Sequence, residues 1–148
     1  MTAAVSAEAL RDRPVLLRGI RLGQVTEVVV DLEALRVVGF EVRCGDETDR
    51  FLPFPVAEIG ESEIELTSAL QLLDERDLGF YRRHTSALRM LRGLAVERRG
   101  RALGTLVDVV VAPDGTIGSV AVDRDGARVE VAVTEGVSIG GRRVASAA

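Results

Sequence analysis

The residues best suited to nucleophilic or zinc chemistry are too few in this chain of 148 residues to form a site. His84 is the only histidine and Cys44 the only cysteine, and they lie in different parts of the chain. Nucleophilic catalysis needs a nucleophile, a base and an orienting group brought together, and a zinc site needs several Cys or His ligands. We therefore interpret His84 as a packed or solvent-edge helix residue and Cys44 as a small core residue at a strand end.

Carboxylates are numerous enough for acid–base chemistry, but their clusters look like hairpin tips and outer strand faces, and the chain has no lysine to accompany them. The two clusters are Asp46, Glu47 and Asp49, and Glu58, Glu61, Glu63 and Glu65. A further segment, Asp123–Gly126, lacks the later ligands of a calcium loop and is interpreted as a hairpin turn. We expect no catalytic residue, no cofactor and no metal.

All 19 basic residues are arginines, which we attribute first to codon usage. Residues 1–70 hold 7 arginines and 13 acids, residues 71–99 hold 7 and 4, and residues 100–148 hold 5 and 6, so only the middle stretch is basic. That stretch is the best candidate for recognising an anionic partner, and the plainer alternative is a solvated helix that carries arginines. Candidate interaction residues are Phe80, Tyr81, Arg82, Arg83 and Arg89, together with Pro53 and Phe54; Arg92, Arg98 and Arg99 belong to the same basic stretch.

These residues lie on a chain that repeats itself. Residues 10–30 (LRDRPVLLRGIRLGQVTEVVV) align with residues 91–111 (LRGLAVERRGRALGTLVDVVV) at an offset of 81, and Ile59–Gly60 returns as Ile139–Gly140 at an offset of 80. Internal periodicity of this kind indicates duplicated structural units. Each unit has roughly 70–80 residues, which is near the lower limit for an independent core.

Both repeats have the pattern of short β-strands. Runs of β-branched residues end at Val28–Val30 and Val109–Val111, and residues 129–133 alternate between valine and other residues. Such runs favour pleated strands, and three successive valines indicate a strand covered on both faces. Asp125–Gly126 predicts a hairpin turn because both residues tolerate positive φ. The sequence therefore predicts an all-β fold of small antiparallel barrels with internal duplication.

Residues 68–92 change character and predict a helix between the barrels. Tyr81, His84, Leu88 and Leu91 fall on one helical stripe, and Gly93 is a natural C-terminal stop. We expect one helix, broken near Gly79, that packs against one or both barrels.

The start of the chain lacks the basic and apolar regions of a signal peptide, and residues 1–9 are expected to be frayed. No window approaches the ~18 apolar residues that a membrane-spanning helix needs. A single cysteine permits no intrachain disulfide. We therefore expect a cytoplasmic protein without a membrane span.

The repeated motif resembles that of the PRC-barrel family. It reads Val-x3-Gly-x2-Leu-Gly-x-Val-x2-Val-Val-Val-Asp, followed by a glycine-containing strand, Leu-Pro-Phe and Ile-Gly. The first copy carries it at Val15, Gly19, Leu22, Gly23, Val25, Val28–Asp31, Gly39, Leu52–Phe54 and Ile59–Gly60. The second copy carries it at Val96, Gly100, Leu103, Gly104, Val107–Val111, Gly118 and Ile139–Gly140. The second copy departs from it by Ala112 in place of Asp31 and by Ala132 near the Pro-Phe position.

The resemblance implies a strongly bent antiparallel barrel of about six strands in each copy. It also implies a docking or scaffolding role, as in the cytoplasmic domain of the photosynthetic reaction-centre H subunit and the C-terminal domain of the ribosome maturation factor RimM. We predict barrel domains at residues 10–67 and 93–146, joined by a helical connector at residues 68–92.

Two functional hypotheses follow. The leading one is a non-enzymatic protein-interaction or assembly module with an unspecified protein partner, which includes homodimer formation through the barrels or the connector. The alternative is an RNA- or ribosome-associated, RimM-like maturation or binding module that uses the basic connector. Nucleic acid is the less favoured partner because the whole chain has a net charge of −4. A small-ligand or metal-dependent enzyme is the least favoured class.

Overall fold

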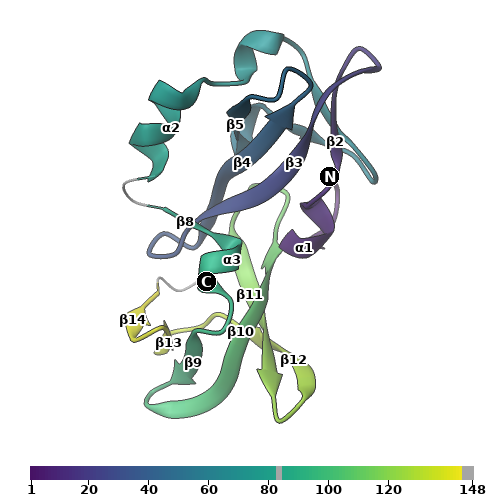
Figure 1. Ribbon diagram of the computed structural model, residues 1–148. Helices are drawn as coiled ribbons and strands as arrows, with labels where there is room; N and C mark the ends of the chain where they lie inside the picture. Colours follow the sequence, from purple (N-terminus) through teal and green to yellow (C-terminus); the bar gives the residue numbers. More distant parts are fainter. Residues whose placement is uncertain (83–84, 145–148) are drawn as a thin grey trace.

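The computed structural model consists of two curled β-sheets stacked end to end (Figure 1). It describes residues 1–82 and 85–144, without the side chains at positions 75, 78, 80 and 82. Strands dominate and the helices are short, which confirms the predicted all-β class with helical structure in the connector. Within the described residues, no helix is long and apolar enough to cross a membrane.

The first sheet is built mainly from the first sequence copy. Its strands follow the order β5-β4-β3-β2-β7-β6, and all neighbours are antiparallel except β2 and β7. The elements are β2 (Pro14–Leu17), β3 (Ile20–Asp31), β4 (Arg36–Cys44), β5 (Asp49–Pro53), the 3₁₀ turn η1 (Phe54–Val56), β6 (Glu58–Ile59) and β7 (Ile64–Leu66). Val28, Val29 and Val30 of β3 are all buried, as expected of a strand covered on both faces.

The second sheet repeats the central part of the first. Its order is β12-β11-β10-β9-β13-β14. The strands are β9 (Ala95–Arg98), β10 (Arg101–Val111), β11 (Ile117–Arg124), β12 (Ala127–Ala132), β13 (Val137–Ile139) and β14 (Arg142–Arg143). The copies diverge at their ends, because β2 pairs with the last strand of its copy, β7, whereas β9 pairs with the strand before the last, β13.

Each copy sends its leading strand and helix to the other copy's sheet. The exchanged segments are β1 (Val5–Ser6) with α1 (Ala7–Leu10), and β8 (Ser86–Ala87) with α3 (Leu88–Leu91). In the second sheet Val5 pairs with Val111 of β10, and in the first sheet Ser86 pairs with Val30 of β3. Val5 and Ser86 are equivalent at the offset of 81, and so are Val30 and Val111. The exchange between the two copies is therefore reciprocal.

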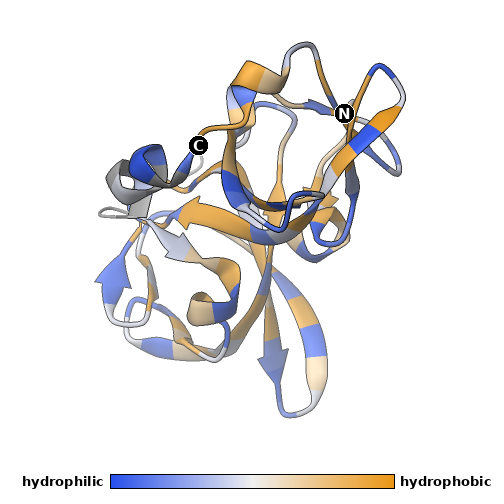
Figure 2. Cartoon of the chain, turned by 45° about the horizontal axis from the view of Figure 1, so that its top comes forward, coloured by the Kyte–Doolittle hydropathy of each residue, from blue (hydrophilic) through white to orange (hydrophobic). Residues whose placement is uncertain are grey.

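The β3–β4 and β10–β11 hairpins also meet at their tips. The Val37 N–H donates to the Gly115 carbonyl (2.9 Å) and the Ile117 N–H to the Leu35 carbonyl (2.8 Å). One hydrophobic cluster runs through both sheets, and Figure 2 shows hydrophobic stretches of strand through the centre of the molecule. The two copies therefore share one core.

Two of the repeated glycines are required by a close approach of neighbouring strands. A Cβ atom on Gly23 would lie 2.4 Å from the Arg43 carbonyl oxygen, and one on Gly104 would lie 2.4 Å from that of Asp123. Gly104 also has a φ of +141° and lies at a register shift between β9 and β10. These glycines therefore belong to the scaffold, where they let a long strand bend.

The connector is not one continuous helix, and this part of the prediction is wrong. It contains the 3₁₀ turn η2 (Ala69–Gln71), α2 (Glu75–Arg82), then β8 and α3. Gly79 lies inside α2, and the helical structure is interrupted later by β8, whose backbone extends to pair with β3. The predicted apolar stripe belongs to two separate helices. Tyr81 of α2 stacks on Phe51 of β5, whereas Leu88 and Leu91 of α3 pack in the shared core.

The start of the chain is ordered, so the expectation of frayed residues 1–9 is also wrong. The Met1 amino group donates to the Ile59 carbonyl (2.6 Å). The Ser6 hydroxyl accepts the Ala9 N–H (3.3 Å) at the start of α1. The local sequence of residues 1–9 does not predict this order, because it depends on contacts with residues far away in the chain.

Candidate interaction surface

A cleft of about 690 Å³ lies between the first sheet and the β10–β11 hairpin. Phe54 and Pro55 of η1 contribute to its apolar part. Residues of both sequence copies contribute to it, because the β10–β11 tip supplies Pro113 and Asp114. The lining residues are Met1, Arg36, Phe54, Pro55, Ala57–Gly60, Glu63, Glu65, Pro113 and Asp114.

The predicted candidates Pro53 and Phe54 differ in their relation to this cleft. Phe54 lines it, although only 7% of the residue is exposed, and its ring lies 6.0 Å from that of Phe40. Pro53 ends β5 opposite Gly39 and is not among the lining residues. Phe54 therefore supports the floor of the cleft, and Pro53 positions the turn that presents it.

The carboxylates of the cleft repel each other. Glu58 of β6 lies directly opposite Glu65 of β7, and like charges in that position destabilise an antiparallel pair. Within the part of the chain that the structure describes, neither carboxylate forms a salt bridge. Glu63 adds a third carboxylate, which accepts the Ser62 hydroxyl (2.5 Å). The acids of this wall therefore outnumber the cations that line the cleft, which are the Met1 amino group and Arg36.

A second cleft, of about 580 Å³, lies at the position that the repeat makes equivalent. The β3–β4 turn, with Asp31–Glu33, replaces the β10–β11 tip, and Ile139–Gly140 replaces Ile59–Gly60. Arg142 of β14 lines it where the first cleft has the acidic β6–β7 pair. The two clefts thus share a scaffold and differ in the charge of one wall.

Tyr81 and Arg89, two of the predicted interaction residues, come together away from the first cleft. With Phe51 they line a pocket of about 140 Å³. The Tyr81 ring stacks on Phe51 with centroids 4.3 Å apart. The Arg89 guanidinium lies 3.3 Å from the buried Glu27 carboxylate. Both side chains therefore have structural roles in covering β5 and β3.

Two further arginines of the basic stretch hold other parts of the chain. Arg92 donates to the Val107 carbonyl (3.1 Å) and pairs with Glu8, and Arg98 donates to the Ala132 carbonyl (3.1 Å). The candidate Arg83, like His84, lies outside the described residues, as do the side chains of Phe80 and Arg82.

The sequence interpretation missed a buried acid on each long strand. Glu27 of β3 and Asp108 of β10 are both 1% exposed and are related by the offset of 81. Asp108 accepts the Ser6 hydroxyl (2.6 Å), the Glu8 N–H (3.2 Å), the Val109 N–H (2.8 Å) and an Arg128 N–H (3.2 Å). A charged residue at the same place in both valine-rich runs was the available signal. Asp108 fastens the exchanged α1 to the second sheet.

Shifted pKa values occur at one buried thiol and at two turn carboxylates. Burial raises the pKa of the Cys44 thiol, and the nearby Arg50 opposes that shift. Because the thiolate is the reactive form, this cysteine is poorly suited to nucleophilic chemistry. Hydrogen bonds from Thr48 lower the pKa of Asp46, and those from Thr116 lower the pKa of Asp114.

In residues 1–82 and 85–144, no group of three or more His, Cys, Asp or Glu side chains is placed to hold a metal ion.

Residues 4–72 match the family described as the PRC-barrel domain, which confirms the resemblance over the first copy. The matched stretch includes β1 and the first three residues of α1, which precede the predicted first domain at residues 10–67. A search of curated proteins found no match.

Proposed function

Because residues 4–72 are a PRC-barrel domain, we propose that this chain is a non-enzymatic, cytoplasmic protein-interaction module that binds a basic segment of a partner protein. The binding site is the acidic cleft between the first sheet and the β10–β11 hairpin. The observation that carries the proposal is the placement of Glu58 opposite Glu65 with no salt bridge to a described residue. A partner's arginine or lysine between these carboxylates turns a repulsive pair into an attractive triad.

The shape of the cleft suits such a segment. Phe54 and Pro55 provide an apolar surface beside the carboxylates. Long basic side chains pack their methylene stems on apolar surface and keep the charged end in a polar environment. Arg36 stands at the other side, where it donates to the Asp114 carbonyl (3.1 Å) and helps to hold the hairpin tip in place.

The non-enzymatic part of the proposal is supported by the roles of the reactive groups. Cys44 is buried at the end of β4 with a raised thiol pKa. Asp108 and Glu27 are held by backbone and arginine donors. These three groups hold the fold, which supports a role of the chain without proton transfer by them.

The test is affinity capture from native lysate, with quantitative mass spectrometry, for the wild type and the variants E58R and E65R. Each reversal replaces an attraction to the partner's cation by a repulsion, and we expect capture of the partner to fall about tenfold, which corresponds to about 1.4 kcal/mol. The same variants remove the Glu58–Glu65 repulsion and should stabilise the fold by about 0.5 kcal/mol. Loss of binding with a gain in stability separates a functional from a structural role.

The matched control is E135R, which makes the same charge change at an exposed loop residue outside the cleft. It should retain the partner. Equal capture by all variants, or equal loss from E135R, would show that the cleft is not the binding site.

The RNA-associated alternative stays a prediction. It requires binding that weakens steeply with salt and is lost when Arg82, Arg83 and Arg89 are neutralised. Nuclease treatment of the same lysate distinguishes it, because a protein partner is retained after digestion.

A further inference from the structure

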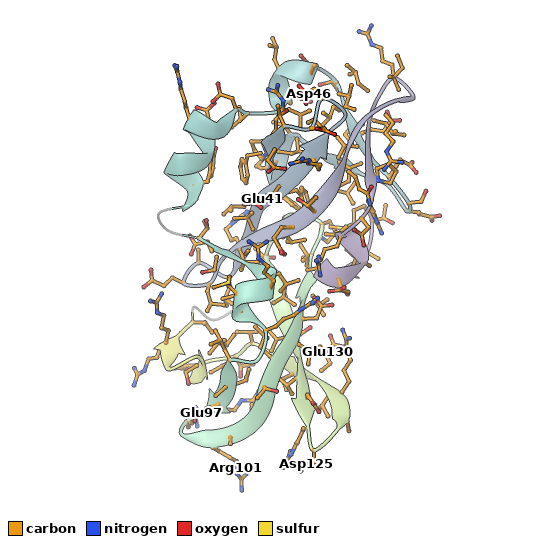
Figure 3. All side chains as sticks on the ribbon, in the orientation of Figure 1. Glu41, Asp46, Glu97, Arg101, Asp125 and Glu130 are labelled. Carbon is orange, nitrogen blue, oxygen red and sulfur yellow. The ribbon has the colours of Figure 1, made fainter. Side chains whose placement is uncertain are left out.

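Strand β12 is the edge of the second sheet, and among the described residues it pairs with β11 alone. Residues 127–130 are all exposed, and Val129 is 41% exposed. The β11–β12 hairpin projects from the lower part of the molecule (Figure 1), with Asp125 at its tip and Glu130 on β12 (Figure 3). An exposed edge strand is a template for pairing with another chain.

The backbone of β12 directs its free groups outward at two residues. Asp125–Gly126, both with positive φ, form the two-residue turn of the hairpin, and such a turn is closed by a hydrogen-bonded pair. Alternation along the antiparallel ladder then points the N–H and C=O groups of Arg128 and Glu130 away from β11. Ala132 has the same parity, and its carbonyl accepts a side-chain donor, Arg98, at 3.1 Å.

At the equivalent position, the edge of the first sheet already forms one antiparallel bridge to a residue outside its strands. Phe51 of β5 faces Glu41 of β4, as Glu130 of β12 faces Ala121 of β11. The Phe51 N–H donates to the Leu73 carbonyl (3.0 Å), and the Leu73 N–H donates to the Phe51 carbonyl (2.7 Å). This ladder position is therefore sterically suited to strand addition.

The sequence of β12 is complementary to itself. In an antiparallel pair centred on Val129, Arg128 of each copy faces Glu130 of the other, and the two Val129 side chains face each other. Centring on Arg128 or Glu130 instead places like charges opposite each other, which destabilises the pair. If the pair is centred between two residues instead, the outward-pointing N–H and C=O groups of one copy face residues of the other copy whose groups point inward, toward β11. The Val129-centred register satisfies charge and backbone together.

We propose that the chain forms a two-fold homodimer in which β12 pairs antiparallel with β12 of a second copy, centred on Val129. The same surface patch then serves both partners, as a closed two-fold dimer requires. Arg128 uses one terminal nitrogen for Asp108 (3.2 Å) and has further donors for the second copy. The proposal does not rest on the basic partner of the cleft, because no cleft residue belongs to β12.

The primary test is sedimentation equilibrium of the full chain over a wide concentration range. We expect a mass that rises from 15.9 kDa to twice that value. In E130R, two arginines oppose each other at each end of the strand pair, so the dimer dissociation constant should rise at least about tenfold. E135R, the same charge change outside β12, should leave it unchanged, and E130R should leave capture of the cleft partner unchanged.

A second test reads the register directly. In a C44A background, V129C should oxidise to a disulfide-linked dimer, because facing side chains at a non-hydrogen-bonded pair lie close together. E130C should not link to itself, because position 130 faces position 128. Mixing E130R with R128E should restore a heterodimer, which also shows that both variants are folded.

A monomer at concentrations up to about 1 mM, a dimer equally stable in E130R, or equal cross-linking of V129C and E130C would overturn the proposal. A dimer lost in E130R and linked through V129C would support it.

Discussion

The two sheets place the equivalent strand at one edge, and among the described residues this edge is covered in the first sheet and open in the second. At β5, Leu73 occupies both backbone groups of Phe51, and the Tyr81 ring stacks on the Phe51 side chain. At β12, the only backbone hydrogen bond to a partner other than β11 in the described structure comes from the Arg98 side chain of β9, which donates to the Ala132 carbonyl. The difference shows that Leu73 and Tyr81, which follow the first barrel in the chain, cover an edge that the barrel itself leaves accessible.

The two clefts also differ between the copies, in the charge of one wall. Both are built from an Ile-Gly turn and the hairpin tip of the other copy, but Glu58 and Glu65 stand in the first cleft where Arg142 stands in the second. Repeated valines and glycines hold the shared scaffold. Residues that differ between the copies give each copy its own surface, and we place the binding functions there.

The largest expected effect separates the closed edge from the open one. Phe51→Ala removes a fully buried ring and its stacking partner, so it should lower the free energy of unfolding by about 3–5 kcal/mol. Glu130→Ala, at the equivalent ladder position, should change it by no more than about 0.5 kcal/mol. Urea unfolding at low protein concentration measures both.

Phe51→Leu is the matched control, since it keeps most of the buried volume and should cost less than Phe51→Ala. Similar losses at positions 51 and 130 would contradict the view that only the first edge is closed.

A smaller difference is expected between the two buried acids. Asp108→Ala leaves three protein donors and Arg128 without their acceptor, so it should cost about 2–3 kcal/mol. Glu27→Ala should cost about 1–2 kcal/mol, because Glu27 accepts one backbone N–H and Arg89. Urea unfolding of both variants tests the order.

The arginine partners provide the control for that comparison. Arg128→Ala and Arg89→Ala should each cost about 1 kcal/mol or less, because both arginine side chains are more than half exposed. An equal loss from both acids would mean that the donors to Asp108 add nothing to the fastening of α1.

Much of the fold could be predicted because its signals are local. The valine runs and the Asp125–Gly126 turn specify strands and a hairpin through backbone preferences. The exchange of β1 and β8 could not be read in this way, since Val5–Ser6 and Ser86–Ala87 become strands only through partners about a hundred or sixty residues away. The connector prediction was wrong for the same reason: a helical stripe cannot distinguish one helix from two elements that pack on different surfaces.

The candidate surface shows the same limit. Phe54 is a candidate because the second copy lacks the Pro-Phe pair, and the structure places it in the lining of the first cleft. The Glu58–Glu65 opposition depends on the register of β6 with β7, which the alternating acids of residues 58–65 do not reveal by themselves. The reciprocal positions of Glu27 and Asp108 were visible in the repeat, but their burial follows from the exchanged helices.

The smallest expected effect concerns two turns that share a motif. The pKa of Asp46 is lowered first by the Thr48 hydroxyl (2.5 Å), and that of Asp114 by the Thr116 hydroxyl (2.7 Å). Because folding lowers these pKa values, the stabilisation is present above the ordinary Asp value and is lost as the pH falls through the folded value. Thr48→Val should raise the pKa of Asp46 alone, and Thr116→Val that of Asp114 alone, in carboxyl NMR titrations.

Arg36→Ala distinguishes the two turns, because Arg36 is a further cause of the lowered pKa only at Asp114. A rise in the Asp114 pKa with no change at Asp46 would show that the charge of Arg36, in the first sheet, acts on Asp114 in addition to the backbone hydrogen bonds between the two hairpin tips. Unchanged values at both carboxyls would mean that Arg36 acts there only as a donor to the Asp114 carbonyl. In that case, hydrogen bonds alone hold the β10–β11 tip in its position beside the first cleft.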